Sequence, residues 1–422
     1  MARAGRSRLA GPQRLTAVPA SAAPAAPLRP SGLDRRLALR LWLRGLLLAK
    51  PLDRLRRPFL PDLEQWQALA AYRGLVQQAF SQRPFAPQVG ADVWYQGRFQ
   101  GSAGRPAFFN PAQRELEPSS HHYGHDVQLK RHAGLPLLGR PLPLLLEHGL
   151  KVSRGATFEA PRPWSRGYLC MGPLRAQWLQ ERFGLPALAI GPWIQYARPV
   201  LAEGELQALR QSLGPTLLVL LAHSWDRVER RMDLDDCVAA VREIGAAGGY
   251  RTVIWLRHWQ DPPLPPLPQG WIVACNGHRS NPWFLDALRT LLELSDGLAT
   301  NAFGTHLGYA VALERRLHWV GVEAEQDLSG LAEVQSAQEA QEWRERQRLS
   351  KEVSGALSGE ASGRATSSEV MQTIRKLLDP FWGFECVYEP RELAVILRYP
   401  HKMATIRSGN AYGVGGSSRH YQ

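Results

Sequence analysis

The clearest pattern in the sequence lies between residues 201 and 330, where short apolar runs alternate with amphipathic segments of helical length. The runs are continuously apolar, which is typical of strands buried on both faces of a sheet. Repeated alternation of strand and helix predicts a parallel sheet with right-handed crossovers. The five runs are TLLVLLA (216–222), TVIWLR (252–257), WIVAC (271–275), GLATN (297–301) and LHWVG (317–321).

A weaker form of the same alternation precedes this region. We expect strands in LPLLLEHG (142–149), YLCMG (168–172) and ALAIG (187–191), with a helix over PLRAQWLQERFG (173–184) that starts at proline and ends at glycine. Further upstream, the pattern predicts a helix at about 61–80 and a strand at 91–95. Residues 97–136 are rich in Gly, Pro, Ser and His, which predicts loops.

Changes in composition divide the chain into seven predicted segments. Residues 1–33 contain no Asp or Glu and are rich in Arg, Ala, Pro and Ser, which favours a disordered arm or a targeting extension. The segments are a disordered arm (1–33), a basic amphipathic helix (34–56), an N-terminal domain (57–200), a C-terminal domain (201–330), a helix with a flexible insert SGALSGEASGRATSS (331–366), closing helices (367–400) and a disordered tail (401–422).

The basic helix allows two interpretations. Its arginines form one stripe, and leucines and Trp42 fill much of the remaining surface. A helix of this kind binds anionic membrane surfaces, but a helix packed on the first domain has a similar pattern. No apolar run approaches the length of about 18 residues that a bilayer crossing requires.

Charge and cysteine content narrow the function classes. The formal net charge of +13 allows two interpretations: a solvated basic surface, or attraction to the phosphate groups of a nucleotide sugar or an anionic membrane. We find no nucleic-acid-binding motif, so no nucleic-acid partner is expected. The four cysteines form no CxxC pair, which argues against a zinc site or a disulfide framework and for a reducing, cytoplasmic compartment.

Candidate ligand-binding residues follow the strands of the second region. In parallel α/β sheets, ligands bind beyond the carboxyl ends of the strands. The polar residues at those ends are His223, Ser224, Arg257, His258, Asn276, Asn301, Gly304, Thr305 and His306.

The segment from Gly304 to His306 is the most informative of these. Small residues where a strand gives way to a helix expose backbone N–H groups, and the helix dipole there favours a phosphate. Thr305 would add a hydroxyl donor. The alternative is that Thr305 only caps the helix.

The first region offers candidates for proton transfer. Three residues are candidates to take a proton from the hydroxyl group of an acceptor substrate: Asp126, Glu147 and His148. Each of them also has a structural interpretation. The histidines of HHYGHD (121–126) suggest a metal as a minor alternative, but no HExxH pattern accompanies them, so no metal or other cofactor is predicted.

A resemblance extends this interpretation. The segments EHGLKV (147–152), YLCMGPLRAQWLQERFG (168–184) and AIGPWIQYARP (189–199) resemble GT-B-type proteins of bacterial capsular and surface polysaccharide synthesis. LLVLLAHSWDR, VIWLRHW and LSDGLATNAFGTHLGYAVALERRLHWVG resemble their donor-binding domain. The resemblance covers about residues 90–325. It implies an α/β fold with two Rossmann-like domains that face each other across a cleft.

Two positions depart from that family's pattern. An acidic residue followed by alanine is replaced by Gly308-Tyr309-Ala310, and a lysine-plus-His-Pro pattern is replaced by Arg257-His258-Trp259.

The resemblance implies a metal-independent glycosyltransferase that takes a nucleotide-sugar donor and a surface-glycan or lipid-linked acceptor. Peripheral attachment to the inner face of the cytoplasmic membrane is a further expectation. Two alternatives remain: a nucleotide-sugar epimerase, and a non-catalytic nucleotide-sugar-binding or assembly protein of envelope polysaccharide synthesis.

Overall fold

The computed structural model describes the central part of the chain, in ranges separated by short gaps. These are residues 76, 77, 80, 115–136, 141–156, 158–224, 228–258, 261, 264–276, 279, 281–358 and 367–403. The predicted arm (1–33), basic helix (34–56) and strand at 91–95 lie outside the described residues. All described residues belong to one compact unit, Leu60–Gln422.

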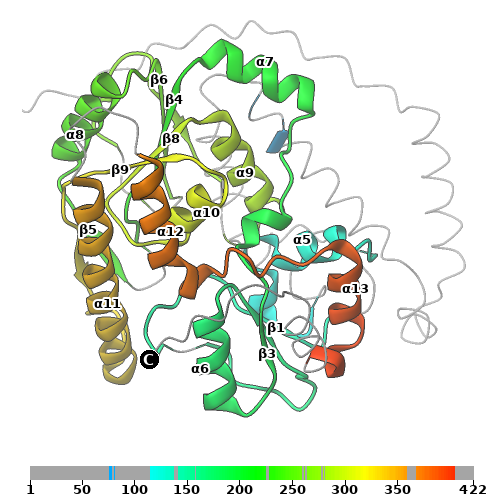
Figure 1. The fold of residues 1–422 in the computed structure, drawn as a ribbon. Coiled ribbons are helices and arrows are strands. Elements are labelled where there is room, and N and C mark those ends of the chain that lie inside the picture. Colours follow the sequence, from blue (N-terminus) through cyan, green and yellow to red (C-terminus); the bar gives the residue numbers. More distant parts are fainter. Residues whose placement is uncertain are drawn as a thin grey trace, which may run out of the picture. The chain divides into compact units, whose positions relative to one another are not determined.

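The predicted five-stranded parallel sheet is confirmed (Figure 1). Its order is β7-β6-β4-β8-β9. Numbered along the chain, this is 3-2-1-4-5, the order of the first five strands of the classic Rossmann sheet. The strands are β4 (Thr216–Val219), β6 (Thr252–Leu256), β7 (Ile272–Ala274), β8 (Gly297–Thr300) and β9 (Arg316–Trp319).

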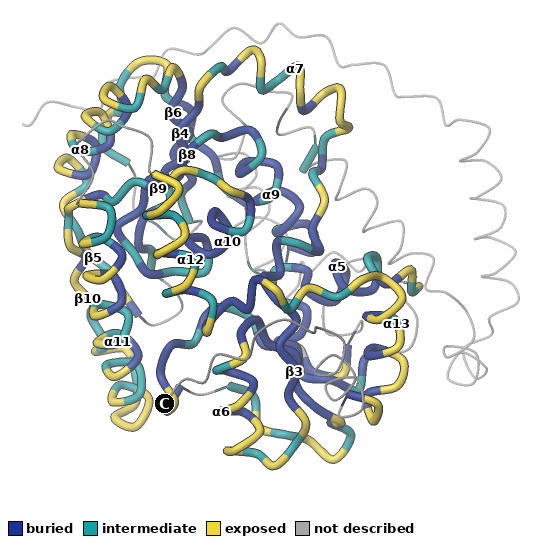
Figure 2. The backbone as a smooth tube through the Cα atoms, viewed as in Figure 1, coloured by how far each residue is buried: buried dark blue, intermediate teal, exposed yellow. Residues whose placement is uncertain are grey.

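Alternate side chains of this sheet pack into two separate hydrophobic layers. Leu217 and Val253 contact α8 (Leu234–Ala247), and Leu218 and Ile254 contact the layer of α9 (Phe284–Leu294) and α10 (Thr305–Ala312). Both faces of the central strands are therefore buried, as their continuous hydrophobicity predicts (Figure 2). The helix α7 (Glu203–Leu213) leads into β4.

A second, smaller parallel sheet belongs to the first half of the chain. Its order is β1-β2-β3, with strands β1 (Leu145–Leu146), β2 (Tyr168–Cys170) and β3 (Ala187–Ala189). The predicted helix after β2 is confirmed as α6 (Pro173–Phe183), and a 3-10 turn, η5 (Trp193–Tyr196), follows β3. The two parallel sheets confirm the α/β class; separate domains divided near residue 200 stay a prediction.

The predicted loop over 97–136 is wrong in its last part. Residues Pro118–Gly124 form the 3-10 helix η4 and His125–His132 form α5. The helix α5 is polar in sequence but buried, because tertiary ion pairs satisfy its charges: Lys130 pairs with Glu115, and Arg131 pairs with Asp286 of α9 at 2.7 Å.

The predicted closing helices are confirmed as α12 (Ser368–Trp382) and α13 (Pro390–Arg398). The helix α12 packs against both α6 and α10 and so joins the two halves. Two glycines permit this approach. A Cβ on Gly172 would lie 2.2 Å from the backbone of Phe381, and one on Gly308 would lie 2.1 Å from Nε1 of Trp382. The departure at Gly308 thus has a packing reason.

Two boundaries differ from the prediction at the C-terminal side. The helix α11 (Glu333–Ser358) continues into the first residues of the predicted flexible insert, and residues 359–366 lie outside the described part. Residues 401–403, which we assigned to the tail, belong to the fold. Pro400–Lys402 forms the 3-10 turn η6 and Met403 is buried.

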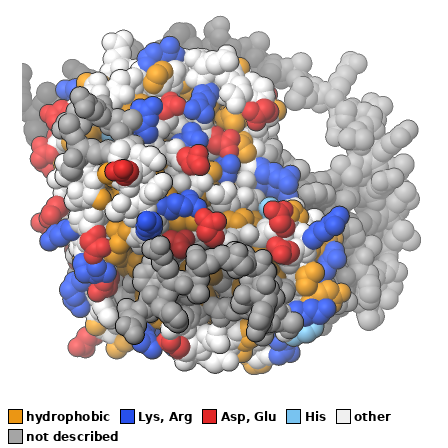
Figure 3. Space-filling model, viewed as in Figure 1, with side chains coloured by type: hydrophobic (Ala, Val, Ile, Leu, Met, Phe, Trp, Pro, Cys, Tyr) orange, Lys and Arg blue, Asp and Glu red, His pale blue; other side chains and the backbone are white. Residues whose placement is uncertain are grey.

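The net charge is carried mainly by the N-terminal residues. Residues 1–59 contain thirteen Lys or Arg and two Asp or Glu, which accounts for +11 of the total of +13. On the face drawn in Figure 3, basic and acidic side chains are interspersed. Among the helices of the described part, none combines the length and apolarity that crossing a membrane requires.

Candidate functional site

Histidine rings gather where β4 and β6 end. The ring of His223, after β4, stacks on that of His258, after β6, with centroids 4.3 Å apart and planes inclined by 18°. His223 Nδ1 lies 3.0 Å from the carbonyl oxygen of Ser224, and the backbone N–H of His258 donates to Asp261. The carboxyl ends of adjacent parallel strands therefore bring these two predicted residues into contact.

Two arginines that the sequence did not single out lie beside these rings. Arg230 belongs to β5 (Glu229–Arg231), which pairs antiparallel with β10 (Glu325–Asp327). It donates to the carbonyl oxygen of His223 at 3.3 Å, and its guanidinium lies 4.8 Å from the centroid of the Trp343 ring. Among the described residues, no carboxylate lies within ion-pair distance of Arg230.

Arg346 of α11 joins the same group and links both sheets. It donates to the carbonyl oxygen of Phe303, after β8, at 2.7 Å and to that of Leu150, after β1. Its carboxylate partner, Glu342, lies 3.0 Å away and accepts from the backbone N–H groups of Val152 (2.9 Å) and Ser153 (2.8 Å).

The histidines of this group are held neutral. Burial lowers the pKa of His223 to about 4, that of His258 to about 2 and that of His306 to about 3. The charge of Arg346 adds to this effect at His223 and His306. Burial also lowers the pKa of Arg230 to about 10, and Arg346 is the next cause. The positive charge of the site therefore resides on arginines, and the rings supply neutral donors and acceptors.

The helix α10 begins beside this group. Gly304 is its N-cap residue and provides no side-chain cap, and Thr305 is the first helical residue. Trp382 Nε1 donates to the Thr305 carbonyl at 3.3 Å, and His306 Nε2 lies 2.7 Å from Thr300 Oγ1. A Cβ on Gly304 would lie 2.5 Å from the His306 ring, so glycine is required here for packing as well.

The other strand-end residues predicted from the sequence differ in how many hydrogen bonds their polar groups form. The amide of Asn301 accepts from Ala222 (2.8 Å) and donates to Val322 (3.0 Å), so it ties three strand ends together. Ser224 Oγ accepts from the backbone of Arg230 at 3.0 Å. In contrast, Arg257 Nε and Asn276 Nδ2 are buried without a hydrogen-bond partner in the described part of the chain. Buried donors of this kind are available to form hydrogen bonds with a ligand or with water.

The first sheet contributes a second histidine pair. His148, after β1, places Nε2 3.3 Å from Nδ1 of His122, and its own Nδ1 is buried without a partner. Its pKa lies well below the usual value, first because of burial and then because of the neighbouring His122 and other charges that include Arg279.

A backbone contact connects the two groups of histidines. The Tyr123 N–H donates to the carbonyl oxygen of Arg279, in the segment after β7, at 2.5 Å. Tyr123 has a φ of +58°, which a bulky residue adopts only when its surroundings impose it. The Arg279 charge lowers the pKa of both His148 and His258. The two strand-end groups therefore lie around Arg279.

The two carboxylates predicted for proton transfer are deeply buried. Glu147 forms a bidentate ion pair with Arg175 of α6, with distances of 2.6–2.9 Å. Asp126 lies in the first turn of α5, where its charge raises the pKa of Glu115. Within the described residues, no three His, Cys, Asp or Glu side chains are arranged to hold a metal ion.

Comparisons with known proteins give only a weak structural likeness. No family model and no curated protein matches the sequence. Among solved structures, the chain is similar to apo UGT2 of Phytolacca americana, a glycosyltransferase, with 12% identity and a TM-score of 0.22. The match covers 59% of this chain and 55% of that one, so it spans about half of that protein. A likeness of this size does not establish a shared fold.

Proposed function

We propose that this chain is a glycosyltransferase-like protein that binds a nucleotide sugar where the strands of its two sheets end. One observation carries the proposal: Arg230 and Arg346 lie beside the stacked His223–His258 pair and the start of α10, and Arg230 has no carboxylate partner among the described residues. An excess of positive charge at the end of a parallel sheet favours an anion, and a diphosphate is the anion that suits guanidinium groups and a helix start together.

The donor side would act chiefly through electrostatic stabilisation. The charge that develops on a departing diphosphate would be met by Arg230, Arg257 and the backbone N–H groups at the start of α10. Neutral histidines would donate hydrogen bonds without adding repulsion between cations. We propose the remaining strand-end residues as donor contacts or as supports for them: Ser224, Asn276, Asn301, Gly304, Thr305 and His306.

The acceptor side would need a group that takes a proton. His148 is our first candidate, because an unprotonated imidazole can accept a proton and its Nδ1 has no hydrogen-bond partner among the described residues. Glu147 is one residue away, and its ion pair with Arg175 would fix the end of β1 and so position His148. We keep Asp126 as a further candidate, since it lies in the same element as His125.

We further propose that the acceptor is a surface glycan or a lipid-linked sugar, that the two halves face each other across a cleft as domains, and that residues 34–56 attach the chain to an anionic membrane from the cytoplasmic side. The support for these points is the sequence resemblance and the Leu, Trp and Arg pattern of residues 34–56.

The proposal is tested with nucleotide sugars. We expect at least one UDP-, GDP- or ADP-sugar to raise the unfolding temperature of the full chain, because a ligand of the native state stabilises it. With glycan acceptors present, the chain would release the nucleoside diphosphate. His148→Gln would keep donor binding but lower transfer by about 10²–10⁴-fold. His401→Gln, at an exposed position, is the control.

The outcomes separate the three functions. Sugar interconversion on the nucleotide without an acceptor would indicate the epimerase, and binding without turnover would indicate the non-catalytic protein. If no nucleotide sugar shifts the unfolding temperature, the proposed function is wrong.

A further inference from the structure

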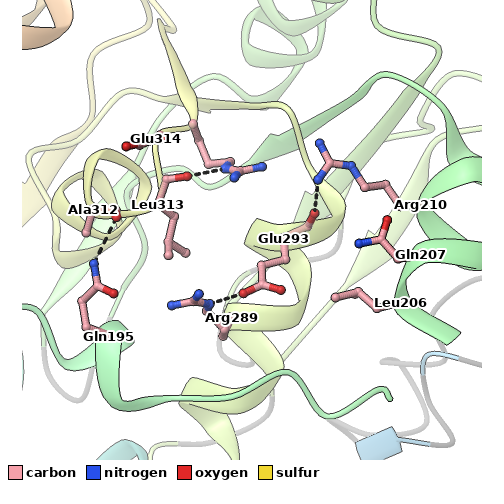
Figure 4. Close-up of a pocket in the computed structure, with 10 residues that line it drawn as sticks. Gln195, Leu206, Gln207, Arg210, Arg289, Glu293, Ala312, Leu313 and Glu314 are labelled. Atoms are coloured by element: carbon pink, nitrogen blue, oxygen red, sulfur yellow. Dashed lines mark hydrogen bonds and ion pairs between the residues drawn. The ribbon is translucent and has the colours of Figure 1, made fainter. Parts of the chain in front are cut away.

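A cavity of about 320 Å³ lies at the opposite end of the five-stranded sheet, where strands begin, away from the carboxyl ends described above (Figure 4). Its walls come from α7, from the last turns of α9 and α10, and from residues 313–315, which lead into β9. Because α9 leads into β8 and α7 leads into β4, the cavity lies where these strands begin. Its volume is at the lower end of the range for ligand sites, which fits a small ligand.

Three arginines line this cavity, and two of them have carboxylate partners. Arg289 pairs with Glu293, and Arg210 pairs with Asp296 at 2.7 Å. In Figure 4 Arg210 and Arg289 approach from different sides. Arg315 donates to the carbonyl oxygens of Leu313 (2.7 Å) and Ser295 (2.9 Å). No carboxylate pairs with Arg315 among the described residues.

The unpaired charge of Arg315 is unfavourable in this position. Partial burial lowers its pKa, and the nearby charge of Arg210 lowers it further. The charges of Asp296 and Glu293 act in the opposite direction, but these carboxylates pair with Arg210 and Arg289. Carbonyl oxygens offset a buried guanidinium charge only in part, whereas an anion would offset it fully.

Helix capping alone does not explain this arrangement. Arg210 donates to the carbonyl of Glu293 (3.2 Å) and Gln195 to that of Ala312 (3.1 Å), so both side chains also complete helix ends. Capping accounts for these hydrogen bonds but leaves the Arg315 charge beside an open cavity. The remaining acidic residue of the lining, Glu314, is exposed.

We propose that this cavity is a second anion site, which binds a phosphate monoester or inorganic phosphate through Arg315, with Arg210 and the Gln207 amide as further donors. A planar guanidinium group can present two N–H groups to one phosphate. The site is distinct from the proposed donor site. The eight-residue helix α10 separates them, with Thr305 at one end and Ala312, about 10 Å away, at the other.

The test uses inorganic phosphate and the full chain at constant ionic strength set with chloride. Binding is measured by calorimetry, and it is located by hydrogen exchange at residues 312–316 and, separately, at residues 301–307 and 223–230. We expect phosphate to slow exchange at 312–316. Arg315→Gln would abolish this effect and weaken the corresponding binding at least tenfold, while protection elsewhere stays unchanged.

Arg251→Gln is a matched control. Arg251 also donates to carbonyls at a helix end, those of Leu213 (2.8 Å) and Ser212, but it does not line the cavity. Both substitutions remove capping hydrogen bonds, so both would lower stability, and only Arg315→Gln would remove phosphate binding. If Arg315→Gln fails to fold, Arg315→Lys is measured in its place. The proposal is then judged by whether phosphate slows exchange at residues 312–316 in the unmodified chain.

Phosphate that protects residues 312–316 equally in the unmodified chain and in Arg315→Gln would overturn the proposal. So would protection confined to residues 223–230 and 301–307, because phosphate would then bind at the proposed donor site only.

Discussion

Arg230 combines partial burial, a contact with the Trp343 ring and a charge without a carboxylate partner in the described part of the chain. We expect Arg230→Gln to weaken binding of a nucleoside diphosphate by about 1.5–3 kcal/mol, the value typical of hydrogen bonds to charged groups. Arg257→Ala should have an effect of the same size, since Arg257 Nε has no hydrogen-bond partner among the residues that the structure describes. Calorimetric titration of the folded variants measures both effects.

Arg375→Gln is the control for these two variants, because Arg375 is a half-buried arginine that pairs with the exposed Glu385, away from the strand ends. Its affinity for the diphosphate should equal that of the unmodified chain. Unchanged affinity in both Arg230→Gln and Arg257→Ala would instead place the diphosphate elsewhere.

Thr305 now gives a sharper prediction than the sequence allowed. Gly304 occupies the cap position and Thr305 follows it, so Thr305→Ala removes no side-chain cap. We therefore expect a change in stability within about 0.5 kcal/mol, the usual range for such sites. Affinity for a nucleotide sugar should fall more than affinity for the bare nucleoside. Equal losses for the two ligands, measured by titration, would show that Thr305 does not contact the diphosphate.

At the scale of elements, the packing of α12 depends on its close approach to two glycines, Gly172 and Gly308. Gly308→Ala places a methyl group against Trp382, whose Nε1 bonds to Thr305. Overpacking of this kind costs about 1–3 kcal/mol. We expect a lower unfolding temperature, measured by calorimetry, and weaker nucleotide-sugar binding, because the start of α10 would shift.

Gly355→Ala is the matched control for this substitution. Gly355 also lies within a helix, but nothing lies within 4 Å of the position its Cβ would take. Alanine there should stabilise the chain by up to about 1 kcal/mol. A neutral effect of Gly308→Ala would mean that α12 packs more loosely than the structure shows.

Elements differ in how well the sequence predicts them, and burial is the reason. The strands β4, β6 and β8 are buried on both faces, so continuous apolar runs identify them. The helix α5 was predicted as loop because its buried residues are polar and depend on partners distant in sequence, such as Asp286. Local periodicity contains no information about such pairs.

The candidate site shows the same division. Strand-end residues such as His223 and His258 follow from the rule that parallel strands end at one edge. Arg346 does not, because Arg344, Arg346 and Arg348 alternate along a helix with few buried positions, and only the tertiary contact with Leu150 and Phe303 distinguishes Arg346. The sequence likewise gives no sign that Arg230 belongs to the site, because it lies in the polar ERR segment of the short strand β5.

At the scale of the whole molecule, the buried histidines predict how stability depends on pH. The pKa of each is lowered mainly by burial: His125 to about 3, His223 to about 4, His258 to about 2 and His306 to about 3. In the unfolded chain they would titrate near 6.5. Below that pH the unfolded chain binds protons that the folded chain does not, so the free energy of unfolding falls as the pH falls.

Three carboxyl groups act in the opposite direction, because burial raises the pKa of Asp261 to about 6 and also raises those of Glu117 and Glu115. Burial raises the pKa of Glu115 to about 7, so between pH 7 and about 4.5 the folded chain holds a proton there that the unfolded chain lacks, which favours folding as the pH falls. Each histidine contributes at most about 1.4 kcal/mol per pH unit, and so does Glu115. Since the four histidines outnumber the three carboxyl groups, and since the pKa of Asp261 is raised only to about 6, we expect a net loss of stability from pH 7 to pH 5, of about 2 kcal/mol or more.

Urea unfolding of the full chain at pH 7 and pH 5 measures this loss. The double variant His223→Gln, His258→Gln should show a smaller loss, because glutamine cannot take up the protons that favour the unfolded chain. A nucleotide sugar should also reduce the loss in the unmodified chain, because a bound diphosphate raises the pKa of neighbouring histidines. Equal stability at both pH values would mean that water or anions reach these rings. The site would then be more open than the described residues indicate.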